Sequence, residues 1–246
     1  MSSFDLDHVA IALRDVGPTV RALVGELGAR VLFGGANLGF QAMHLDAGDL
    51  RIELIEPWNT EVNDFLERFL QRNGEGPHHL TFKTDDIERE LERVQAAGYS
   101  PVGVSIDNPW WKEAFIHPKE AGGTVVQIAQ SGIEPEHLDR EVREYGPGRW
   151  WAEPPEPASE RATLRRVVVV TDEVGRAIEL YSDLLGGQTL EHGEGWIELV
   201  WPGGGKIMVE AAAERRQGIH RLEWTHNGSR SQALIGGTRI DLYPES

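Results

Sequence analysis

A short pattern of strands around one helix occurs twice in the first half of the chain, and this repeat restricts the fold more than any other feature. The first copy begins with an apolar stretch at 4–13. It continues with a helical pattern that ends at Gly28 and closes with three strand-like runs up to Pro57. The second copy begins at 78–84, continues with an amphipathic helix at 85–98, and closes with three more strand-like runs. Both copies predict the order βαβββ, and a repeat of this kind indicates paired modules.

The same order begins a third time near residue 164. A strand-like run, RRVVVVT, precedes a helical pattern carried by Ile178, Tyr181 and Leu185, and three short apolar runs follow. The remaining residues contain strand patterns but are too few for another full helix. We therefore predict an α+β protein of paired βαβββ modules, arranged as two tandem domains of which the second is truncated.

The composition changes in the middle of the chain. Residues 132–163 contain five prolines, many charges and the pair Trp150–Trp151, which is typical of a linker that packs on a domain surface. The predicted organisation is a first domain at 1–131, a proline-rich linker at 132–163 and a degenerate second domain at 164–246.

Charge and composition disfavour several classes of partner. The 24 Lys and Arg residues against 40 Asp and Glu residues give a net charge of −16, and no basic cluster stands out, so we expect neither nucleic acid nor a membrane surface as a partner. Without cysteine there is no disulfide, thiolate metal site or cysteine nucleophile. The N-terminal residues lack the pattern of a signal peptide, and no apolar run approaches the ~18 residues of a membrane helix. These features predict a soluble, cytoplasmic protein.

Side chains able to bind metal occupy matching positions of the first two modules. His8 and His79 lie in the first strands of the two modules, and Glu53 and Gln127 lie in their last strands. Two such modules packed about a pseudo-two-fold axis bring all four side chains into one cleft. Because a buried carboxylate without a partner is costly, a metal ion is a natural explanation for Glu53 among apolar neighbours.

Each of these residues also has a structural interpretation. A strand histidine such as His8 is often satisfied by ordinary hydrogen bonds, and Glu53 can pair with Arg51 or another cation. The matched positions therefore suggest a metal site without deciding it.

Four segments of the first half resemble the vicinal oxygen chelate superfamily, which includes glyoxalases, bleomycin-resistance proteins and dioxygenases, and the similarity is greatest to its methylmalonyl-CoA epimerases. These segments are DHVAIAL (7–13), RIELIEP (51–57), GEGPHHLTFKTDDIERELERVQAAGY (74–99) and FIHPKEAGGTVVQIAQ (115–130). The resemblance implies a divalent metal between paired modules, with ligands at His8, Glu53, His79 and Gln127. Co²⁺, Ni²⁺, Mn²⁺, Fe²⁺ and Zn²⁺ all remain candidates.

The sequence departs from this family at both proton-transferring carboxylates. Gln127 is an amide where the family has glutamate, and an amide cannot accept a proton at neutral pH. The family's other base, a glutamate on the third strand, aligns near Gln41 or Ala42. His44 is expected to share the face of Ala42, and it is the candidate catalytic base. Equally, His44 is compatible with a strand residue that has no chemical role.

The resemblance implies a metal-dependent isomerase, epimerase or lyase that acts on a carbonyl-containing small molecule through an enolate-type intermediate. An acyl-CoA is one candidate substrate, and Lys119 could meet its phosphate. Two alternatives remain: a small-molecule binding protein of the bleomycin-resistance type without catalysis, and an Fe(II) dioxygenase. Both a monomer and a homodimer are compatible with the sequence. The candidate substrate contacts are Gln41, Trp110, Trp111 and Phe115.

The second domain does not repeat the ligand set. Its residues at the positions of His8, Glu53, His79 and Gln127 are, in that order, Arg166, Met208, Arg221 and Asp241. Two arginines and a thioether do not form a site for a hard metal ion, so we predict a second domain that has lost the site.

Overall fold

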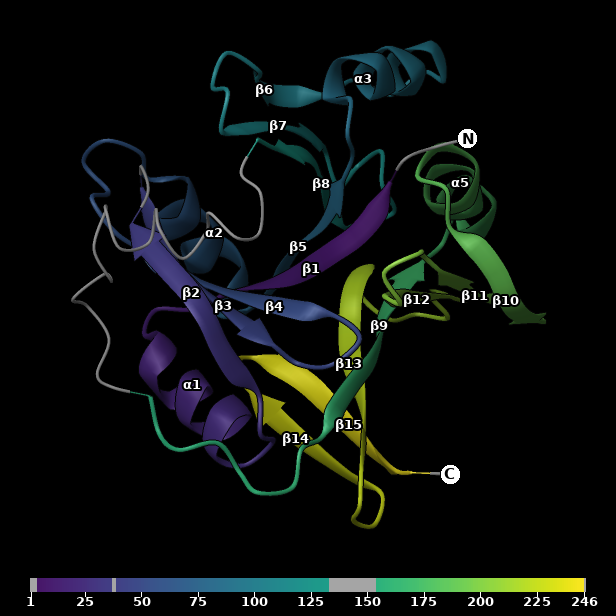
Figure 1. The fold of residues 1–246 in the computed structure, drawn as a ribbon. Coiled ribbons are helices and arrows are strands. Elements are labelled where there is room, and N and C mark those ends of the chain that lie inside the picture. The colour runs from purple at the N-terminus through teal and green to yellow at the C-terminus, as the bar shows by residue number, and fades with distance from the viewer. Residues whose placement is uncertain (1–3, 37–38, 133–153, 246) are drawn as a thin grey trace. The chain divides into compact units, whose positions relative to one another are not determined.

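The first half of the chain forms one eight-stranded sheet in the computed structural model, which describes residues 4–36, 39–132 and 154–245 (Figure 1). The first module consists of β1 (Asp5–Ala12), α1 (Val16–Gly25), β2 (Arg30–Ala36), β3 (Phe40–Asp46) and β4 (Arg51–Pro57). Helix α2 (Phe65–Asn73) follows. The second module consists of β5 (Gly76–Lys83), α3 (Ile87–Ala96), β6 (Val102–Ser105), β7 (Trp111–Ile116) and β8 (Val125–Ser131). The strand order β2-β3-β4-β1-β5-β8-β7-β6 makes the first strands of the two modules neighbours.

The second half repeats this arrangement in a seven-stranded sheet with the order β10-β11-β12-β9-β13-β15-β14. Its first module consists of β9 (Thr163–Thr171), α5 (Val174–Ile178), the π-helical continuation η1 (Glu179–Leu184), β10 (Gln188–Gly193), β11 (Trp196–Val200) and β12 (Lys206–Ala211). Its last module has only β13 (Gly218–His226), β14 (Ser231–Ile235) and β15 (Thr238–Pro244). Among the described residues, this module has no counterpart of β6 or α3. The predicted fold, with its truncated second half, is confirmed.

Two compact units combine modules from both halves. The first unit comprises the described parts of Met1–His8, His78–Ile133 and Arg166–Arg221, and the second comprises those of Val9–Pro77, Glu134–Arg165 and Leu222–Ser246. Strand β1 contributes to both units. The division into 1–131, 132–163 and 164–246 stays a prediction, and Trp150 and Trp151 lie outside the described residues.

An aromatic cluster lies in the core of the first unit. The Phe82 ring from β5 lies 5.2 Å from the Trp201 ring and 6.0 Å from the Tyr181 ring, measured between ring centroids. Phe82 and Tyr181 are fully buried, and the indole nitrogen of Trp201 donates a hydrogen bond to the Leu185 carbonyl at 2.7 Å. Strand alternation directs Phe82 away from the face that carries His79.

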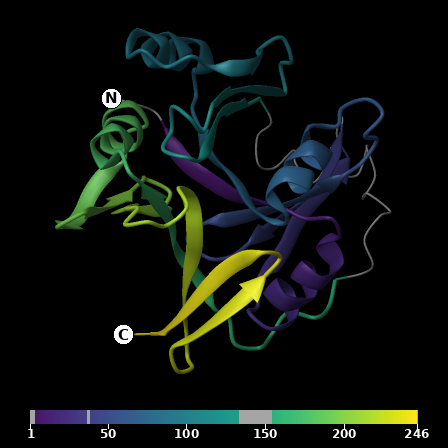
Figure 2. The ribbon, with the colours of Figure 1, turned by 180° about the vertical axis from the view of Figure 1, so that it is seen from behind.

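Two helices stabilise the second unit. Asp15 caps α1 by accepting a hydrogen bond from the Gly17 amide, and the apolar face of α1 is buried. The hairpin of β14 and β15 lies against α1 in both views (Figures 1 and 2), and its turn residue Gly236 has φ 53°. A Cβ atom there would come within 2.6 Å of Leu13 and Thr19, so glycine is required for this contact. Helix α2 buries Leu66 and Leu70 in a cluster with Ala12, Ala42 and Ile55.

No helix in the described part of the chain is long and apolar enough to cross a membrane.

Phe82 provides a test of the aromatic cluster. We expect Phe82→Ala to lower the free energy of unfolding by about 3–5 kcal/mol, because the substitution leaves a cavity between Tyr181 and Trp201. Urea denaturation measures this change. Leu234→Ala is the control: Leu234 is 75% exposed, so its removal should cost no more than about 0.5 kcal/mol. Equal effects of the two substitutions would contradict the proposed role of the cluster.

Candidate metal centre

Two of the predicted metal ligands lie next to each other on the neighbouring strands β1 and β5. The imidazole rings of His8 and His79 have centroids 5.8 Å apart and meet edge to face. Both side chains are buried, at 2% and 6% exposure. Their burial keeps bulk water away from two nitrogen donors of the kind that bind Zn²⁺, Co²⁺, Ni²⁺ and Fe²⁺.

Hydrogen bonds fix the orientation of both imidazoles. The Nδ1 atom of His8 lies 2.7 Å from a carboxylate oxygen of Asp7, and its Nε2 atom lies 2.9 Å from the hydroxyl of Thr81. Asp7 also pairs with the Lys83 ammonium at 3.2 Å. The Nδ1 atom of His79 lies 2.7 Å from the Nδ1 atom of His78. A carboxylate behind an imidazole, as Asp7 lies behind His8, is the common arrangement around metal-binding histidines.

A chain of polar contacts continues from His8 toward β7. The Thr81 hydroxyl donates to the Oε1 atom of Gln127 at 2.6 Å, and the Nε2 atom of Gln127 donates to Glu113 at 2.7 Å. Sequence reasoning missed Asp7, Thr81 and Glu113. Thr81 lies two residues after His79 and so shares its face, a signal that was available in the strand pattern.

Glu53 and His44 face each other across strands β4 and β3 of the second unit. They are direct partners in the antiparallel register, and the His44 Nε2 atom lies 3.3 Å from a Glu53 carboxylate oxygen. The His44 ring stacks on Phe33 with 4.4 Å between centroids. Ala42 shares this face, as the sequence predicted. Gln41 lies on the opposite face, where it donates to Glu56, so the structure does not bring it together with His44.

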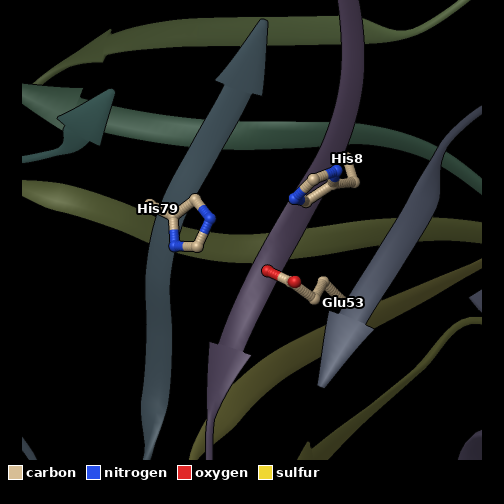
Figure 3. Close-up of side chains that lie close together, drawn as sticks. All are labelled: His8, Glu53 and His79. Atoms are coloured by element: carbon tan, nitrogen blue, oxygen red, sulfur yellow. The ribbon is translucent and has the colours of Figure 1, made fainter. Parts of the chain in front are cut away.

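His8, Glu53 and His79 form the one group of at least three histidine, cysteine or acidic side chains in the described residues that could hold a metal ion. One ligand atom from each lies within 4.8 Å of the others. Figure 3 shows the two imidazoles and the carboxylate turned toward one another. Two imidazoles and one carboxylate fit a divalent transition metal or zinc.

The predicted aromatic contacts divide into two groups. Trp111, Glu113 and Phe115 alternate along β7, and Phe115 is the direct register partner of Gln127, so these three side chains share the face of Gln127. The indole nitrogen of Trp111 donates to Glu113 at 2.8 Å. Trp110 precedes the strand and is 55% exposed, and Lys119 is also exposed on a turn, so neither is brought to this face.

Residues 7–115 match the family model of the Glyoxalase/Bleomycin resistance/Dioxygenase superfamily. This part of the chain is therefore similar to that superfamily. The ethylmalonyl-CoA/methylmalonyl-CoA epimerase of Cereibacter sphaeroides is 28% identical over 134 residues, which cover 51% of this chain and 96% of that protein. The human mitochondrial methylmalonyl-CoA epimerase is 28% identical over 132 residues, which cover 51% of this chain and 73% of that protein. The predicted resemblance is confirmed.

A solved structure extends the similarity of fold to both halves. The crystal structure of a hypothetical protein from Staphylococcus aureus matches with a TM-score of 0.69 over 98% of this chain and 100% of that chain. At 12% identity, this similarity concerns the fold alone.

The second sheet carries ion pairs at the positions equivalent to the predicted ligands. Gln127 is the register partner of Thr81, and Asp241 is the register partner of Glu223, so Arg221 takes the position of His79. In the first unit, Arg166 pairs with Glu198 at 2.9 Å and Arg221 pairs with Glu210 at 2.6 Å. Guanidinium groups therefore supply positive charge where the first sheet has imidazoles.

Arg215 also donates to Glu210, at 2.5 Å. Burial alone would raise the pKa of Glu210, but hydrogen bonds from Arg221 and Arg215 outweigh burial and lower this pKa from 4.5 to about 2. The ionised carboxylate is therefore favoured in the folded state.

This ion pair predicts a pH-dependent contribution to stability. Because the folded-state pKa of Glu210 lies below the unfolded value, its contribution is complete above about pH 4.5 and is lost as the pH falls toward 2. We expect Glu210→Gln to reduce the free energy of unfolding at pH 7 by about 1 kcal/mol, a value discounted for partial solvent exposure. The difference should shrink between pH 4.5 and pH 3, measured by thermal melts. Glu191→Gln is the control, because Glu191 is exposed. If the loss of unfolding free energy in Glu210→Gln stays constant with pH, the lowered pKa of Glu210 does not stabilise the fold.

Proposed function

We propose that this chain is a metal-dependent epimerase or isomerase that acts on a carbonyl-containing small molecule, with an acyl-CoA as the substrate class. The observation that carries the proposal is the buried group of His8, Glu53 and His79 in a chain similar to the Glyoxalase/Bleomycin resistance/Dioxygenase superfamily. The relatives named as methylmalonyl-CoA epimerases support the reaction type and the substrate class.

In this proposal His8, Glu53 and His79 hold a divalent ion, and the carbonyl oxygen of Gln127 is the fourth ligand. The donor set fits Co²⁺, Ni²⁺, Mn²⁺, Fe²⁺ and Zn²⁺. When bound, such an ion supplies Lewis acidity that stabilises negative charge on a substrate oxygen. Asp7 supports this role because its carboxylate fixes the ring of His8.

His44 is the proposed proton-transferring residue. Its ring is oriented by the Phe33 stack and by Glu53, and an imidazole can both take and return a proton near neutral pH. The Gln127 amide cannot do so. In this mechanism His44 removes the proton next to the substrate carbonyl, and the position to which the proton returns decides between epimerisation and isomerisation. Trp111 and Phe115 offer apolar contacts to the substrate.

The first test is metal binding. We expect purified wild-type protein to bind one equivalent of Co²⁺ per chain, because the second sheet carries arginines at the equivalent positions. Glu53→Gln and His79→Ala should each weaken binding at least about 100-fold, a larger loss than removal of an outer-shell partner causes. Equilibrium dialysis with metal analysis measures this. His117→Ala removes an exposed histidine and should bind like the wild type. Full occupancy in either ligand variant would overturn the ligand assignment.

The second test concerns proton transfer. We expect the metal-loaded wild type to exchange the α-proton of methylmalonyl-CoA with deuterium from D₂O. His44→Asn should slow this exchange about 10²–10⁴-fold while metal binding persists. Proton NMR follows the exchange. Tight binding of the thioester without any exchange would instead favour a binding protein, and oxygen uptake with Fe²⁺ and catechols would favour a dioxygenase.

A further inference from the structure

We infer that Glu113 is a positioning residue for the candidate metal centre: it holds the Gln127 amide so that the carbonyl oxygen, and not the nitrogen, faces Thr81 and His8. This inference rests on the metal centre proposed above. All four of these residues belong to the first compact unit.

Glu113 decides which way the amide of Gln127 points. The Nε2 atom of Gln127 lies 2.7 Å from a carboxylate oxygen of Glu113, and its Oε1 atom lies 2.6 Å from the Thr81 hydroxyl. A hydroxyl can donate or accept, so Thr81 tolerates either amide orientation. A carboxylate only accepts, so a flipped amide would place its carbonyl oxygen against the Glu113 oxygen. The Glu113 contact therefore selects the orientation.

Trp111 fixes Glu113 in turn. Its indole nitrogen, which can only donate, lies 2.8 Å from the same Glu113 oxygen that accepts from Gln127. The Lys83 ammonium lies 5.4 Å from the centroid of the Trp111 ring and 3.2 Å from Asp7. The contact with Lys83 thereby links the Trp111 indole to β5. The Glu113 carboxylate, which accepts from this indole, is therefore held in one position.

The orientation matters because only one end of an amide can bind a metal ion. A glutamate at position 127 would offer an oxygen in either orientation, whereas a glutamine that rotates by a half-turn presents an NH₂ group with no available lone pair. An unrestrained Gln127 would therefore be a ligand for only part of the time. Residues that orient metal ligands in this way typically contribute 10–100-fold to affinity.

A double-mutant cycle tests the inference through metal affinity rather than activity. We expect Glu113→Ala and Gln127→Ala each to weaken Co²⁺ binding, by up to about tenfold, and the double variant to bind no more weakly than Gln127→Ala alone, because both substitutions act through the same ligand. The Co²⁺ absorption spectra of Gln127→Ala and of the double variant should be the same, since both lack the oxygen ligand, and the spectrum of Glu113→Ala should be shifted from the wild type toward theirs. Glu113→Gln, whose amide can also donate and so permits the flipped Gln127, should weaken binding by an intermediate amount. Glu113→Gln also tests the inference if the Glu113→Ala protein does not fold.

The control and the outcomes separate this inference from the proposed function. Glu88→Ala removes a carboxylate that pairs with Lys112 of the same strand β7, and it should leave Co²⁺ affinity unchanged. If wild-type protein binds no Co²⁺, the metal centre itself is wrong. A different result contradicts the positioning role alone: the wild type binds Co²⁺ and His79→Ala abolishes this binding, but the Glu113→Ala protein binds as tightly as the wild type. The role is also wrong if the double variant binds more weakly than Gln127→Ala alone.

Discussion

Buried charge must be compensated within the protein, and both sheets are organised around this constraint. The first sheet buries the carboxylate of Glu53 near imidazoles, and Asp7 lies between His8 and Lys83. The second sheet instead surrounds its buried acids with guanidinium groups, as in the pair of Arg166 and Glu198. An arginine carries a permanent positive charge that compensates a buried carboxylate, whereas neutral imidazoles need an added cation to do so. The first half therefore carries a group of side chains that fits a metal ion, whereas the second half carries guanidinium groups at the equivalent positions.

On strand β5 the candidate site and the aromatic core lie on opposite faces, whereas on β3 and β4 an apolar cluster lies on the same face as His44 and Glu53. On β5, His79 and Thr81 face the polar group while Phe82 contacts Trp201 of the second half. In the second unit, Ala12, Ala42 and Ile55 form an apolar cluster under α2. Ala42 and Ile55 share the face of His44 and Glu53. Packing on one face of β5 therefore holds the polar side chains of its other face in place. On β3 and β4, the apolar cluster under α2 lies beside His44 and Glu53 and helps to fix their positions.

The repeat in the sequence predicted the order of the strands and the candidate ligands because both are local properties. Alternation within a strand places His44 with Ala42, and the matching of modules places His79 beside His8. Gln41 was harder to assign, because an error of one residue in aligning a strand exchanges its two faces. Glu113 was missed for another reason: its contact with Gln127 depends on the pairing of β7 with β8, which no local pattern contains. Modules from different halves of the chain combine into compact units, and this too depends on long-range contacts that no local pattern contains.

The proposed ligand set has a further electrostatic consequence. Two neutral imidazoles, one carboxylate and one amide leave a divalent ion with a net positive charge, whereas a second carboxylate ligand would cancel it. A net positive charge favours an anionic substrate oxygen, which is the charge that develops when a proton leaves the carbon beside a carbonyl. Glu113 keeps a carboxylate one hydrogen bond away from the ligand position. In the proposed site the negative charge is thereby moved outward, where it would orient the amide without neutralising the ion, and His44 is the proposed group for proton transfer.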